Sequence, residues 1–153
     1  MSQPQPNTLA LNRGPLRYLG QGVPPDQVPI EPPPPDVDRF HLGAHPDVVA
    51  WLWDRLGAAL PAGGERLVAG GAALIDPKTG VLFGAALGTS YAIRLRGEPL
   101  AAAREAGYTS VHTFTSVNRT LDLAASFGVG WLFGRFDDRE PEWLAESYSA
   151  ANL

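Results

Sequence analysis

The sequence has no cysteine, one lysine and no long apolar run, and each of these shortages excludes a class of protein. Without cysteine the chain can form no disulfide, zinc ribbon, iron–sulfur cluster or thiol nucleophile. No segment approaches the roughly 18 apolar residues of a membrane span, and the first thirty residues lack the basic start and apolar run of a secretory signal. We therefore expect a cytoplasmic protein without a membrane partner.

Basic charge is also scarce. Sixteen acidic residues against 12 basic ones give a formal net charge of −4, and Lys78 is the only lysine. Nucleic-acid binding needs a basic surface that neutralises phosphates, so this balance argues against nucleic acid as a partner. The length of 153 residues and the apolar content of 44% suit one domain with its own core.

Proline is abundant but unevenly placed. Ten of the 15 prolines fall within residues 1–35. Because proline lacks a backbone N–H and has a fixed φ, we expect residues 1–40 to form an extended arm. The arm is either a solvated linker or tail, or a segment that docks on a partner protein. The apolar anchors for such docking would be Leu16, Tyr18 and Leu19.

The remaining residues, 41–153, predict a globular domain. Apolar residues at helical spacing after residues 45–47 indicate a helix of about fifteen residues. The alanine-rich stretch 99–106, closed by Gly107, predicts a second short helix. The acidic run 137–142 predicts the start of a C-terminal helix.

Strands are predicted from alternation and from turn chemistry. Residues 67–75 and 81–87 flank the turn sequence Asp-Pro-Lys-Thr-Gly, a pattern typical of a buried hairpin. The alternation over residues 91–96 indicates a half-exposed third strand. Three shorter strands are expected over residues 108–114, 120–123 and 129–136. This order of elements predicts an α+β fold with a mostly antiparallel sheet flanked by two or three helices.

The stretch GVGWLFG, residues 128–134, comes within one residue of a dinucleotide-binding fingerprint. Its third glycine comes late, its aromatic residues favour a strand, and no helix signal follows directly, so we expect no phosphate binding. As a strand, it has a glycine face that lets another backbone approach closely and an aromatic face. The aromatic face is either core or a partly open partner-binding surface, with Trp131, Phe133 and Arg135 as its candidates.

His112 is expected on a strand, either as a hydrogen-bonded structural histidine or as a general base. A polar site for an anionic small molecule would combine Arg94, Arg96, His112 and Arg119. His41 and His45 are four residues apart, but Gly43 and Pro46 oppose the helix that a shared metal ion would need. No serine-nucleophile motif is present. We therefore expect no metal site and no cofactor.

These patterns together predict a non-catalytic protein-interaction module that binds a partner protein. A toxin-neutralising immunity-type protein and an adaptor in a larger assembly, both of bacterial type, would fit a compact acidic domain. One alternative is a small enzyme that uses His112 and the nearby arginines. The other is a structural subunit of a homo-oligomer, which exposed strand edges would allow.

Overall fold

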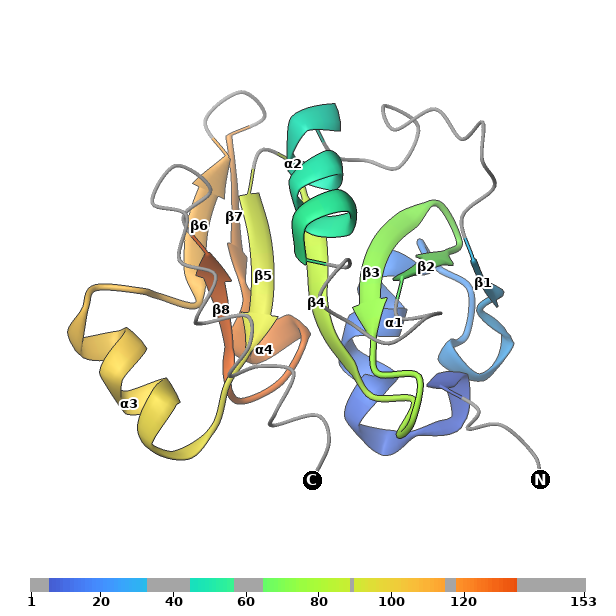
Figure 1. The fold of residues 1–153 in the computed structure, drawn as a ribbon, viewed down its shortest axis with the longest axis horizontal. Coiled ribbons are helices and arrows are strands. Elements are labelled where there is room, and N and C mark those ends of the chain that lie inside the picture. The colour runs from blue at the N-terminus through green and yellow to red at the C-terminus, as the bar shows by residue number, and fades with distance from the viewer. Residues whose placement is uncertain (1–5, 33–44, 57–64, 89, 115–117, 135–153) are drawn as a thin grey trace.

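The computed structural model describes residues 6–32, 45–56, 65–88, 90–114 and 118–134. A six-stranded antiparallel sheet has the order β1-β2-β3-β4-β5-β8, and a second sheet pairs β6 with β7 (Figure 1). The strands are β1 (Ile30–Glu31), β2 (Glu65–Val68), β3 (Gly71–Ile75), β4 (Leu82–Leu87), β5 (Ser90–Arg94), β6 (Val111–Phe114), β7 (Arg119–Asp122) and β8 (Trp131–Gly134). The helices are α1 (Arg13–Leu19), α2 (Pro46–Ala50), α3 (Gly97–Glu105) and α4 (Leu123–Ser126), with a π-helical turn η5 (Trp51–Leu56) and 3-10 turns η1 (Pro6–Thr8), η2 (Ala10–Asn12) and η3 (Pro25–Gln27). The predicted α+β fold with a mostly antiparallel sheet is confirmed.

The hairpin of β3 and β4 is confirmed, and Asp76 organises its turn. The buried carboxylate of Asp76 accepts hydrogen bonds from the backbone N–H of Lys78 (2.9 Å) and the hydroxyl of Thr79 (3.1 Å). An aspartate that bonds to the backbone two residues ahead is a standard way to start a turn.

The predicted continuous strand over residues 67–75 is wrong, because the chain reverses at Ala69 and Gly70. Both residues have positive φ, 41° and 94°, as a two-residue hairpin turn of the primed type requires. The reversal creates β2, whose Val68 pairs with Gly71 of β3. An alanine at a positive φ gives no sequence signal for such a turn.

Side chains of the six-stranded sheet alternate between two buried clusters, one on each face. Tyr91 and Ile93 of β5 join the cluster that packs against α2 and η5, whereas Ala92 joins the cluster that packs against α1 and α4. Figure 1 shows α2 in front of the sheet and α1 and α4 behind it. The predicted alternation is confirmed, but both faces of β5 are covered along these three residues, so the strand is not half-exposed there.

Residues 6–32 contain short helices and a strand where we expected an extended chain. Two of the prolines occupy positions that a helical turn tolerates. Pro25 begins η3, and Pro15 lies in the first turn of α1, where a backbone N–H would have no hydrogen-bond acceptor within the helix. Leu16 and Leu19 of α1 are buried against the sheet, and β1 pairs with β2. The segment therefore contains more regular secondary structure than its proline content predicts.

Asn12 fastens this N-terminal segment to the β3–β4 turn. Its buried side-chain amide donates to the carbonyl oxygens of Gly80 and Pro6, both at 2.8 Å, and its oxygen accepts from the backbone N–H of Leu82 at 2.9 Å. Gly14 brings α1 against α4, since a Cβ at this position would collide with the carbonyl oxygen of Phe127.

The remaining predicted elements differ mainly in their boundaries. The first predicted helix changes to a π-helical turn at Trp51, and β6 begins only at Val111. Helix α4 was not expected, although Asp122 caps it by accepting a hydrogen bond from the N–H of Ala124 at 3.0 Å. The predicted C-terminal helix lies outside the described residues. Within the described ranges, no helix has the length and apolarity needed to cross a bilayer.

Candidate partner-binding surface

The aromatic residues of β8 are covered by their own chain. Trp131 is 1% exposed and meets the ring of Phe127 edge-on at 5.0 Å, and Phe133 is 6% exposed with its ring 5.2 Å from that of His112. Neither side chain is available for direct contact with a partner in this conformation. Arg135, the third candidate on this face, lies outside the described residues.

The glycine face of GVGWLFG allows close packing within the chain. A Cβ on Gly134 would overlap the ring of Tyr91, and a Cβ on Gly130 would meet the carbonyl oxygen of Leu95. The backbone N–H of Leu95 donates to the carbonyl of Gly130 at 2.9 Å. These glycines let β8 lie against β5 and the segment that follows it.

The four polar candidates fall into two pairs on different elements. Arg94 ends β5. Burial lowers the pKa of the Arg94 guanidinium, and the nearby positive charge of Arg96 lowers it further. His112 and Arg119 belong to the ribbon of β6 and β7, where His112 pairs with Leu121 and Arg119 with Phe114. This register makes His112 and Arg119 diagonal neighbours on one face of the ribbon.

The histidine near α2 has a local structural role. The Nδ1 atom of His45 accepts a hydrogen bond from the backbone N–H of Asp47 at 3.1 Å and so caps the helix. His41 lies outside the described residues. In the part of the chain that the structure describes, no three histidine or acidic side chains gather into a metal-binding group.

The candidate anchors in the N-terminal segment divide between core and surface. Leu16 is fully buried and Leu19 is 5% exposed, while Tyr18 is half-buried with its ring 5.6 Å from that of Phe127. Two of the three predicted anchors therefore dock on the protein's own sheet.

The same segment also carries one exposed apolar side chain and two exposed basic side chains. Leu11 is 53% exposed, and Arg13 and Arg17 of α1 are also exposed. We call these three residues the N-terminal basic face. Arg13 and Arg17 lie one helical turn apart and therefore share a side of α1. Among the described residues, no carboxylate forms an ion pair with either arginine.

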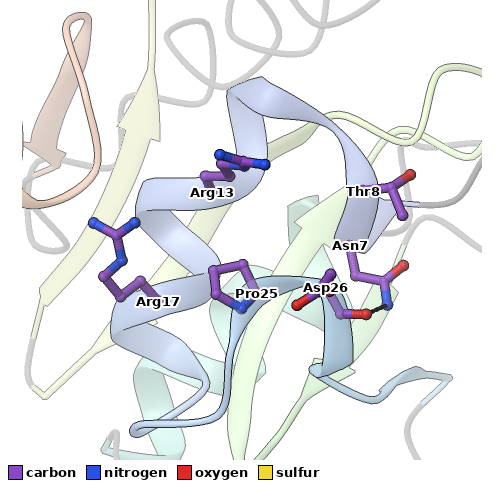
Figure 2. A pocket seen from close by; sticks show the side chains of 6 residues that line it. All are labelled: Asn7, Thr8, Arg13, Arg17, Pro25 and Asp26. Atoms are coloured by element: carbon purple, nitrogen blue, oxygen red, sulfur yellow. Dashed lines mark hydrogen bonds between the residues drawn. The ribbon is translucent and has the colours of Figure 1, made fainter.

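A cleft of about 400 Å³ adjoins the N-terminal basic face (Figure 2). Its lining comes from η1, α1 and η3 and consists of Asn7, Thr8, Arg13, Arg17, Pro25 and Asp26. The side-chain amide of Asn7 donates to the backbone carbonyl of Asp26 at 2.9 Å, which holds η1 beside η3. The cleft thus combines two cations with one carboxylate and neutral polar groups.

Leu11, Arg13, Arg17 and the cleft were not expected from the sequence. The available signal was the spacing of Arg13 and Arg17, four residues apart, but it is meaningful only in a helix.

No protein-family model matches the chain, and no curated protein or solved structure shows significant similarity to it.

Proposed function

We propose that this chain is a non-catalytic protein-interaction module that binds a partner protein through the N-terminal basic face. One observation carries the proposal: the segment buries Leu16 and Leu19 and leaves Leu11, Arg13 and Arg17 outside. An exposed leucine and two exposed arginines within one short segment match the composition of protein interfaces, in which arginine is enriched and apolar contacts are central.

The position of Arg13 adds support. A cation in the first turn of a helix opposes the helix dipole, so Arg13 does not stabilise α1 by its charge. Arg17 stands in the last turn, where a cation is favourable, and its charge is compatible with a purely structural role. Helix stability therefore gives no reason for a cation at position 13, whereas a partner contact does.

The N-terminal basic face is compatible with both kinds of interaction module that the sequence predicts. A toxin-neutralising immunity-type protein and an adaptor in a larger assembly both act by presenting a fixed surface. The hydrogen bonds of Asn12 and the burial of Leu16 and Leu19 hold this surface on the sheet. A pre-ordered surface loses less conformational entropy on binding than a free arm would.

Affinity capture with a matched control tests the proposal. The bait is the full chain, and the test bait carries Leu11→Ser and Arg17→Gln. The control bait carries the same two changes at other exposed sites, Val129→Ser and Arg104→Gln.

We expect wild type and control to recover the same partner from a lysate of the source organism, and the test bait to lose it. The recovered protein is then purified and its binding to each bait is measured. Equal binding to all three baits would contradict the proposal.

A further inference from the structure

We propose that the cleft beside the N-terminal basic face binds a glutamate- or aspartate-bearing peptide segment of the partner. This inference rests on the proposed function and adds the chemistry of the partner. It starts from the lining of the cleft, in which Arg13 and Arg17 have no described carboxylate as an ion-pair partner.

The two arginines form a receptor for carboxylates. A guanidinium group presents a planar fork of N–H donors that fits both oxygens of a carboxylate. Like charges one turn apart on a helix repel each other, so Arg13 and Arg17 destabilise α1 until an anion lies between or beside them. A bound carboxylate relieves this repulsion as well as forming charged hydrogen bonds.

The other lining groups suit a carboxylate that is carried by a peptide. Asp26 brings a negative charge to the same cleft, so the lining combines two cations with one anion. The carboxylate of Asp26 can accept hydrogen bonds from the backbone N–H groups of a peptide, which a phosphate cannot offer. Pro25 offers an apolar surface to the methylene groups of a glutamate side chain.

The lining of the cleft favours a peptide over a free small anion. Asp26 can accept hydrogen bonds from backbone N–H groups, which a peptide carries and a small carboxylate without amides lacks. The exposed Leu11 is outside the lining of the cleft and belongs to the proposed function alone. The occupant that uses the arginines, Asp26 and Pro25 together is an acidic peptide segment.

The test uses the full chain and two labelled peptides of about eight residues with blocked ends. One peptide contains several glutamates and one leucine, and the other has glutamine in place of every glutamate. Fluorescence anisotropy measures both with wild type, with Arg17→Gln, and with Arg104→Gln as the control that removes one exposed positive charge elsewhere.

We expect the glutamate peptide to bind and the glutamine peptide to bind at least about tenfold more weakly. Arg17→Gln should weaken the glutamate peptide by about tenfold, and Arg104→Gln by less than about twofold. Circular dichroism of each variant establishes that α1 and the sheet are still formed.

Three results would overturn the inference: equal binding of the two peptides, no effect of Arg17→Gln, or displacement of the glutamate peptide by an equal concentration of inorganic phosphate. If the peptide test fails while the captured partner still needs Leu11 and Arg17, only the acidic-segment inference is lost. If the peptide binds but the captured partner ignores the face, the proposed function is lost instead.

Discussion

Replacing Asn12 by alanine should loosen the N-terminal segment from the sheet. The substitution removes a fully buried side chain whose hydrogen bonds reach Gly80 and Leu82, 68 and 70 positions away in the sequence. A buried polar group left without its partner costs about 1–3 kcal/mol. The backbone N–H of Leu82 and the carbonyl of Gly80 both lose their partner, so we expect a destabilisation of about 2–6 kcal/mol.

Urea unfolding followed by tryptophan fluorescence measures the change in free energy. Hydrogen exchange adds a local readout, because the amides of α1 should exchange faster in the variant than in wild type. The control is Asn7→Ala, which removes one exposed hydrogen bond to Asp26 and should cost less than about 1 kcal/mol. A loss below about 1 kcal/mol for Asn12→Ala, with unchanged exchange in α1, would refute the view that Asn12 fastens this segment.

Four further substitutions test the packing and the surface. Leu16→Ala should cost about 2–5 kcal/mol in urea unfolding because it opens a cavity under α1, whereas Leu11→Ala at the exposed site should change stability by less than about 0.5 kcal/mol. Gly134→Ala should cost about 1–3 kcal/mol and lower the melting temperature, since the added methyl group overlaps the ring of Tyr91. Asp76→Ala should cost about 1–3 kcal/mol by removing the buried acceptor of the β3–β4 turn, and a melting temperature equal to that of wild type would contradict this role.

The sequence predicted the β3–β4 hairpin because a turn signal lies between two apolar runs. The buried strands on both sides of Asp76 could be recognised because an Asp-Pro-Lys-Thr-Gly turn fixes their pairing. The reversal at Ala69 and Gly70 could not, since alanine rarely adopts the positive φ that it has there.

The short helices of the N-terminal segment could not be predicted from its proline content. Pro15 and Pro25 occupy first-turn positions that favour short helices, while Leu16 and Leu19 supply the apolar side. That both leucines pack inward depends on a sheet built mostly from strands later in the chain, and no local pattern encodes that contact.

The candidate site was only partly predictable for the same reason. Trp131 and Phe133 could be assigned to one face of a strand, but their cover comes from Phe127 and His112, on other elements. Arg13 and Arg17 share one side of α1 only because this segment is a helix, which the sequence did not predict.

The central claim is that the partner contacts the N-terminal basic face. Its most direct test places a photo-reactive amino acid at position 11 or at position 129, both exposed, and illuminates each protein with the captured partner. We predict a cross-link from position 11 and none from position 129. A cross-link from position 129 with none from position 11 would contradict the claim.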